Sequence, residues 1–248
     1  MADWAGLDAE LALWRTARLT PRLWWRDDDA QRVTPQLETL LTLSDAYEVP
    51  VHLSVIPQGQ SPDLAPRLRD AARVHVLQHG FAHINHEPKG SPASEVGVTR
   101  ALELQAEDLR RGWDMLEEAR MPGLLPAFVP PWNRIGDATR RRLPDLGYGF
   151  LSTFVGRGDD TPVAGLVQID AHLDPIRWKY DRVFRGTDKM LTMLLDHLCH
   201  RRVTAPTQPV GYVTHHLQTN DAVWAFTQAL FARTRGLWMT VPDMQSKG

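Results

Sequence analysis

Apolar and polar positions alternate along the chain in a way that predicts strands followed by helices. Short apolar runs typical of buried strands end in polar residues, and segments with apolar residues at helical spacing follow them. Strands are predicted at Leu23–Trp25, Val51–Ile56, Val74–Leu77, Ala127–Val129, Phe150–Phe154, Leu166–Ile169, Gly211–Val213 and Leu237–Thr240. Helices are predicted at Leu64–Ala72, Arg100–Arg120 and Asp221–Thr234, with two more beginning at Thr34-Pro35 and at Thr187.

This order of elements predicts an α/β fold with a parallel sheet, because parallel neighbours need a crossover connection. The number of strand–helix units favours a closed barrel of about seven strands over an open sheet. No Gly-x-Gly-x-x-Gly follows the first strand, which argues against a dinucleotide-binding fold. We therefore expect one domain spanning residues 1–248, with an N-terminal helix within residues 1–20.

Composition narrows the class of protein. The 248 residues carry a formal net charge of −2, which argues against non-specific nucleic-acid binding. The single cysteine, Cys199, excludes an intramolecular disulfide framework. No run of 18 apolar residues and no targeting signal is present, so we expect a cytoplasmic protein without a membrane partner. Composition leaves the oligomeric state open.

Polar residues suited to chemistry follow several predicted strands directly. They are Asp27–Asp29 after the first, His79 and His83 after the third, Pro130–Arg134 after the fourth, and His215-His216 late in the chain. In a parallel barrel the carboxyl ends of all strands open onto one face. Segments distant in sequence are therefore expected to converge at one site.

Two of these clusters together suggest a metal centre. Adjacent carboxylates repel one another unless a cation lies among them, although a solvated acidic turn is an alternative. His79 and His83 stand at i and i+4, so both rings face one side if the segment turns helically; a His-rich surface loop is the alternative. An Asp–His–His set suits a divalent metal, zinc first, with cobalt or nickel as alternatives.

The ordered motifs resemble the polysaccharide deacetylase superfamily, the NodB-homology carbohydrate esterases of the family 4 type. The motifs are Asp28-Asp29 before a small residue, His79-x-x-x-His83, Pro130-Pro131-Trp132 and Thr214-His215, and the ending Trp238–Pro242 resembles the closing strand of that domain. The resemblance implies a distorted, deacetylase-like (β/α) barrel over residues 21–245. It also implies a metal-dependent hydrolase that removes acyl groups, usually acetyl groups from sugars.

The resemblance assigns roles to individual residues. In the register favoured by the small residue after the pair, Asp28 is the general base and Asp29 a metal ligand; Asp27/Asp28 is the alternative register. His79 and His83 correspond to the two histidine ligands. Trp132, preceded by Pro131, corresponds to the aromatic residue whose backbone N–H helps to hold the oxyanion. His215 corresponds to the general acid, with His216 as the other candidate.

Two positions depart from the family pattern. Val129 stands where the family has an arginine that orients the catalytic aspartate, and Arg26 or Arg134 is a candidate replacement. Asn133 stands where a glycine usually follows the aromatic residue. The chain therefore resembles a divergent branch whose substrate need not be a polysaccharide.

Three further residues are candidates for substrate or supporting contacts. Asn85 and His86 lie in the long polar loop 80–98, where a solvated loop is the alternative. Asp174, which precedes Pro175, could orient a catalytic histidine or form a plain turn.

The sequence thus predicts a hydrolase of carbon–nitrogen bonds that acts on an N-acetylated saccharide or sugar-containing metabolite. One alternative is an amidohydrolase of a small non-sugar amide, such as a cyclic amide. The other is a carbohydrate-binding relative without turnover, which the missing arginine motivates.

Overall fold

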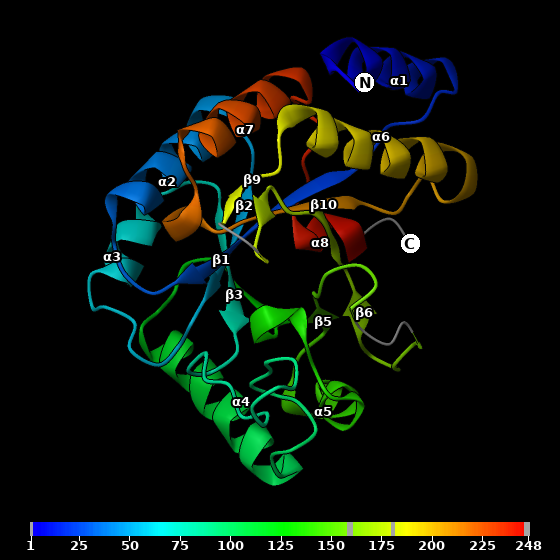
Figure 1. The fold of residues 1–248 in the computed structure, drawn as a ribbon. Helices are drawn as coiled ribbons and strands as arrows, with labels where there is room; N and C mark the ends of the chain where they lie inside the picture. The colour runs from blue at the N-terminus through cyan, green and yellow to red at the C-terminus, as the bar shows by residue number, and fades with distance from the viewer. Residues whose placement is uncertain (1, 158–160, 180–181, 246–248) are drawn as a thin grey trace. The chain divides into compact units, whose positions relative to one another are not determined.

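The computed structural model describes residues 2–157, 161–179 and 182–245. The chain divides into two compact units, most of whose helices and strands are labelled in Figure 1. The first unit contains residues up to Asp27, then Pro35–Val51 and His172–Gly248. The second contains Asp28–Thr34 and His52–Ala171. The predicted single catalytic domain stays a prediction.

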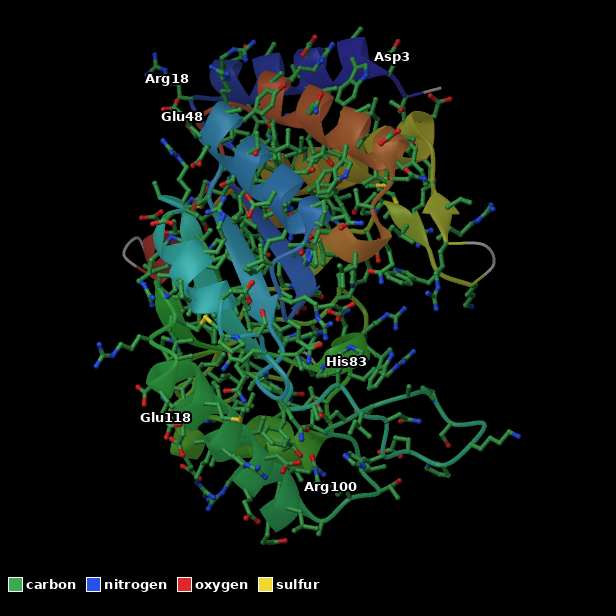
Figure 2. The ribbon with its side chains drawn as sticks, turned by 90° about the vertical axis from the view of Figure 1, so that its left-hand side faces the viewer. Asp3, Arg18, Glu48, His83, Arg100 and Glu118 are labelled. Carbon is green, nitrogen blue, oxygen red and sulfur yellow. The ribbon has the colours of Figure 1, made fainter. Side chains whose placement is uncertain are left out.

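The first unit is built mainly from long helices around a few strands. Asp3 caps the first helix by accepting a hydrogen bond from the Gly6 N–H at 2.9 Å (Figure 2). The helices α1 and α6 pack against each other, and α2 packs against α7 and the short helix η3. The elements are α1 (Trp4–Thr16), β1 (Leu23–Ala30), α2 (Pro35–Tyr47), β7 (Ala171–Leu173), β8 (Ile176–Arg177), β9 (Val183–Phe184), α6 (Thr187–Thr204), β10 (Val210–Thr214), η3 (His216–Gln218), α7 (Asp221–Arg233) and α8 (Val241–Gln245).

The second unit alternates strands and helices. Its amphipathic helix α4 packs on α5, and a core cluster that includes Leu109 and Phe128 fills the space between helix and sheet. The elements are β2 (Val51–Val55), α3 (Leu64–Arg69), β3 (Val74–His79), α4 (Leu102–Glu118), β4 (Leu124–Val129), η1 (Pro131–Asn133), α5 (Asp137–Arg142), η2 (Pro144–Leu146), β5 (Phe150–Leu151) and β6 (Val167–Gln168).

The division between the units falls within three strands: between Asp27 and Asp28 of β1, Val51 and His52 of β2, and Ala171 and His172 of β7. Eight strands follow the order β6-β5-β4-β3-β2-β1-β10-β7, one more than the predicted number of about seven. The pairs β1/β10, β3/β4, β4/β5 and β5/β6 are parallel. The predicted α/β fold with a parallel sheet is therefore confirmed.

The strand register sets where the polar clusters lie. Asp27 of β1 is paired with Thr214 of β10, and His79 of β3 is paired with Val129 of β4. In each parallel pair the residues that follow run in the same direction, although β1 continues to Ala30 whereas β10 ends at Thr214. This arrangement agrees with the prediction that polar residues gather at the carboxyl ends of the strands.

One predicted strand was wrong, and one hairpin was not predicted. Residues 237–240 do not form a strand. Trp238 makes only an isolated parallel bridge to Leu23, in which the Leu23 N–H donates to Leu237 O and the Met239 N–H donates to Leu23 O. The β8–β9 hairpin was missed because each of its strands has two residues, too few to show an alternating pattern. Among the described helices, none combines the length and apolar character needed to cross a lipid bilayer.

Candidate active site

The end of β1 gives its three aspartates three different environments. Asp27 and Asp28 are buried, at 0% and 1% exposure, whereas Asp29 is partly open. Asp29 has a left-handed backbone (φ 71°), a conformation that Asp tolerates better than most residues. The chain therefore turns at Asp29, and neighbouring carboxylates point to different partners.

In the second unit, Asp29 meets both histidines of the predicted pair. Its Oδ1 atom lies 3.1 Å from Nε2 of His79 and 3.3 Å from Nε2 of His83. One potential ligand atom from each residue lies within 4.8 Å of the others. Within the described ranges of the chain, these residues form the one group of three or more His, Cys, Asp or Glu side chains so arranged.

The other ring nitrogen of His79, Nδ1, already has a hydrogen-bond partner. Nδ1 lies 3.0 Å from the Val129 carbonyl oxygen, which can only accept a hydrogen bond, so Nδ1 carries the proton. The Nε2 atom is then directed at Asp29. Burial lowers the pKa of His79, but the hydrogen bond to Asp29 and the charges of Asp28 and Asp29 outweigh it, so the pKa is raised.

The pKa of His83 is shifted in the opposite direction from that of His79. Burial lowers the pKa of His83, and the charge of His79 lowers it further. The opposite shifts make His79 the more basic of the two histidines. A neutral Nε2 and a carboxylate oxygen are both lone-pair donors of the kind that ligate divalent metals.

The two histidines do not share a helical turn, so that part of the prediction was wrong. Gly80 and His83 have positive φ values, 57° and 58°, and the segment between them is irregular. The rings converge nonetheless, with centroids 5.2 Å apart, because the turn folds back on the end of β3. Figure 2 labels His83 at this turn.

Two buried side chains hold this turn, and the sequence analysis selected neither. Gln78 Nε2 donates to the Gly80 carbonyl at 3.0 Å, and its Oε1 accepts from the Tyr148 hydroxyl at 2.6 Å. The Glu95 carboxylate accepts hydrogen bonds from backbone N–H groups of the turn. No pattern in the sequence singles out Glu95, whose partners lie 11 to 14 residues away within an irregular loop.

Trp132 lies beside His83, the more exposed of the two histidines. Its ring centroid is 4.3 Å from that of His83. Trp132 and Asn133 both have a left-handed backbone (φ 56°) within η1, which directs the following chain into a tight turn. Among described residues, the backbone N–H of Trp132 donates to no acceptor, whereas that of Asn133 donates to Pro130 O at 2.9 Å.

In the first unit, His215 is surrounded by an acidic and an aromatic residue. The His215 and Trp178 rings are 4.6 Å apart in an edge-on arrangement. Asp174 accepts from Trp178 Nε1 at 2.6 Å and from the Ile176 N–H at 2.8 Å. Burial raises the pKa of Asp174, and the nearby His215 partly opposes this rise. Asp174 therefore both makes a turn and supports the environment of His215.

His216 has a separate role in the same unit. Its Nδ1 lies 2.5 Å from Asp27 Oδ1, and Thr214 donates to the other Asp27 oxygen at 2.6 Å. The structure thus groups the candidates in two sets, each within its own unit. Asp29, His79, His83 and Trp132 form one; His215 with Asp174, and Asp27 with His216, form the other.

Comparisons with known proteins bear on the fold. The sequence matches no protein-family model and no curated protein. A solved putative polysaccharide deacetylase from Mycobacterium smegmatis is 14% identical with a TM-score of 0.62, and the match covers 91% of this chain and 92% of that one. A family 4 carbohydrate esterase from Streptomyces lividans, solved with acetate, is 13% identical with a TM-score of 0.55 over 87% and 88%.

The chain has the polysaccharide deacetylase fold. The Puue allantoinase has a similar structure, with 14% identity and a TM-score of 0.65 over 92% of this chain and 89% of that one. The predicted distorted (β/α) barrel is therefore confirmed.

Within the polysaccharide deacetylase fold, the remaining candidates lie as follows. Arg134 Nη1 donates to the Ala93 carbonyl at 3.1 Å. Arg26 is fully buried within β1. Pro131 is buried and lies against Gly80 of the turn.

The candidates in the loop after β3 organise the loop itself. Asn85 Oδ1 accepts from the Glu87 and Ser94 N–H groups, both at 3.0 Å. The His86 N–H donates to the Ser94 carbonyl at 3.0 Å. These contacts lie within the loop itself.

Proposed function

We propose that the protein is a metal-dependent hydrolase that removes an acyl group, specifically an N-acetyl group, from a saccharide or sugar-containing metabolite in the cytoplasm. The observation that carries this proposal is one carboxylate oxygen of Asp29 facing the Nε2 atoms of His79 and His83 at 3.1 and 3.3 Å. The polysaccharide deacetylase fold, shared with a family 4 carbohydrate esterase, supports the reaction class.

The donor set fits a divalent metal. Three lone-pair donors lie within 4.8 Å of one another, and the bond from His79 Nδ1 to Val129 O fixes the tautomer that a metal ligand needs. Two nitrogens and one carboxylate oxygen suit zinc, with cobalt or nickel as alternatives. When bound by Asp29, His79 and His83, such an ion would supply Lewis acidity that polarises a carbonyl group and acidifies water.

Asp28 is proposed as the general base. Its carboxylate is buried next to the ligand Asp29 in the chain, and its charge acts on His79. It would accept a proton from the water that attacks the scissile carbonyl carbon. The bond that forms joins the water oxygen to this carbon, and the carbonyl oxygen gains the negative charge.

The backbone N–H of Trp132 is proposed to stabilise that oxyanion. A preorganised N–H donor acts where charge develops and needs no reorganisation during the reaction. Support comes from its proximity to His83 and from the absence of an acceptor for this N–H among the described residues.

His215 is proposed to protonate the leaving nitrogen as the carbon–nitrogen bond breaks. Thr214, which directly precedes His215, ends β10 and is paired with Asp27 of the parallel strand β1. Asp174 and Trp178, which surround His215, are proposed to hold its ring in position.

Two alternatives keep specific support. A small cyclic or other non-sugar amide is the alternative substrate, supported by the allantoinase with a TM-score of 0.65. A carbohydrate-binding protein without turnover is the other, supported by the similar structure of a CE4 family pseudoenzyme mutant, with a TM-score of 0.55.

A hydrolysis screen separates these functions. Purified protein would be assayed on N-acetyl sugars, nucleotide sugars and cyclic amides, with and without a chelator. Chelator-sensitive deacetylation that is lost in Asp28→Asn, with metal retained, supports the proposal. Turnover of cyclic amides alone supports the first alternative, and sugar binding without turnover supports the second. Full activity in Asp28→Asn would overturn the assignment of the base.

A further inference from the structure

The turn that carries His83 has no helix or strand of its own, yet several of its backbone polar groups have hydrogen-bond partners. The Gly80 N–H donates to Val129 O at 3.1 Å, and the Phe81 carbonyl accepts from the Gln58 N–H at 2.8 Å. Three further N–H groups of the turn point toward one side chain. Buried N–H groups without partners are costly, so the residue that accepts from them determines the conformation of the turn.

That side chain is Glu95. Its carboxylate accepts hydrogen bonds from the N–H groups of Phe81 at 3.0 Å, Ala82 at 2.8 Å and Ile84 at 3.4 Å. Glu95 is 1% exposed, so solvent does not compete for these bonds. Successive N–H groups near a left-handed residue form a concavity that binds anions, and here the protein supplies its own carboxylate.

The fit between Glu95 and the turn leaves no spare space. A Cβ atom at Gly80 would lie 1.9 Å from Glu95 Oε2 and 2.6 Å from Pro131 Cγ. Gly80 also has a φ of +57°, which disfavours other residues. Glycine at this position therefore allows the carboxylate to reach the N–H groups.

The neighbours of Glu95 anchor it to the segment after Trp132. Ser94 Oγ donates to Arg134 O at 3.1 Å, and the Gly136 N–H donates to Val96 O at 2.8 Å. The residues on either side of Glu95 are thus hydrogen-bonded to the segment that follows η1. The Glu95 carboxylate itself holds the turn that follows β3. It links the segment of Trp132 to the segment of His83.

We propose that Glu95 is a positioning residue for the metal site: it fixes the Phe81–Ile84 turn and thereby places His83 Nε2 against Asp29. This inference rests on the proposed function for its metal, but the conformational part stands on the contacts of Glu95 alone. Outer residues that orient a ligand typically change metal affinity about 10–100-fold when removed.

Glu87 provides a matched control within the same loop. Its carboxylate also accepts backbone bonds, from Val98 N–H at 2.9 Å and Thr99 N–H at 3.2 Å, and one from the Thr99 hydroxyl. None of its bonds reaches the turn that carries His83. Glu87→Gln therefore removes one negative charge from the loop and weakens its bonds to Val98 and Thr99, and it leaves the turn that carries His83 unchanged.

The test compares the wild type with Glu95→Gln, Glu95→Asp and Glu87→Gln in the full chain. Zinc and cobalt affinity would be measured by calorimetry, and amide hydrogen exchange at Phe81, Ala82 and Ile84 would be measured without metal. We expect both Glu95 variants to bind metal about 10–100-fold more weakly and to exchange these amides faster, while Glu87→Gln matches the wild type. Glu95→Asp keeps the charge but shortens the side chain, so it separates position from charge and provides a milder variant should Glu95→Gln fold poorly.

The outcomes distinguish the two claims. Unchanged metal affinity and unchanged exchange in the Glu95 variants would overturn the role of Glu95, as would an equal loss of metal affinity in Glu87→Gln. If the wild type binds neither zinc nor cobalt, the proposed metal function fails, and hydrogen exchange alone then decides whether Glu95 fixes the turn.

Discussion

The Nδ1 atom of His216 lies 2.5 Å from Oδ1 of Asp27, and the two side chains are 1% and 0% exposed. The second Asp27 oxygen accepts from Thr214, whose hydroxyl oxygen in turn accepts from Trp25 Nε1 at 2.9 Å. Both oxygens of Asp27 therefore serve a buried network that ties β1 to β10. This arrangement favours the register in which Asp28 and Asp29, rather than Asp27 and Asp28, do the chemistry.

Replacing Asp27 should damage the fold rather than the metal site. Asp27→Ala leaves the Thr214 hydroxyl and the His216 ring buried without their acceptor, so we expect a loss of about 2–4 kcal/mol in the free energy of unfolding. Urea unfolding would measure it, and metal content at pH 7 should equal that of the wild type. Loss of metal in a protein of wild-type stability would contradict the assignment.

Replacing His215 should affect substrates according to their leaving group. An amine must be protonated as it leaves, whereas 4-nitrophenolate leaves without help. We expect His215→Ala to reduce kcat on the best N-acetyl amide by about 100-fold or more and to alter hydrolysis of 4-nitrophenyl acetate far less. Equal losses on the two substrates would remove the acid role from His215.

Gly80 and Gly90 offer a matched pair of glycines with positive φ. An alanine Cβ at Gly90 (φ +96°) meets nothing within 4 Å, whereas at Gly80 it would collide with Glu95 and Pro131. Gly90→Ala should cost about 1 kcal/mol of unfolding free energy for its backbone alone. Gly80→Ala should cost more and weaken metal binding; calorimetric affinities that are equal for the two variants would contradict the tight fit at the turn.

Acid should weaken the contact between α1 and α6. Burial raises the pKa of Glu10, but bonds from Arg202 at 2.7 and 3.2 Å and from Cys199 outweigh it, so the pKa lies below its usual value. A carboxyl group with a lowered folded-state pKa stabilises the fold above its unfolded pKa, and this stability is lost as pH falls through the folded-state value.

The urea midpoint of the wild type should therefore fall between pH 7 and pH 3 by more than that of Glu10→Gln. Glu103→Gln, at an exposed position on α4, serves as the control and should follow the wild type. A Glu10→Gln protein with the same pH dependence as the wild type would show that this contact adds no pH-dependent stability.

Much of the candidate site was predictable because it depends on strand ends. Apolar runs locate β1, β3 and β10, and the polar residues directly after them follow at the carboxyl ends of parallel strands. The approach of Asp29 to His79 is of this kind, since both residues end buried strands whose positions the apolar pattern reveals.

The parts that could not be predicted depend on irregular backbone. The spacing of His79 and His83 suggested a helical turn, but Gly80 and His83 adopt positive φ values that no periodic pattern encodes. Glu95 was missed because a loop residue acquires its role only through tertiary contacts. Residues 237–240 have a strand-like sequence, yet only Trp238 forms a bridge, to Leu23.

The metal content of the natively prepared protein tests the central claim most directly. Elemental analysis would be made on the wild type, Asp29→Ala, His79→Ala, His83→Ala and the control Glu87→Gln. We expect close to one zinc, cobalt or nickel ion per chain in the wild type and in Glu87→Gln, and at least about a tenfold lower content in the three ligand variants. Equal metal content in the wild type and the ligand variants, whether high or low, would contradict the account.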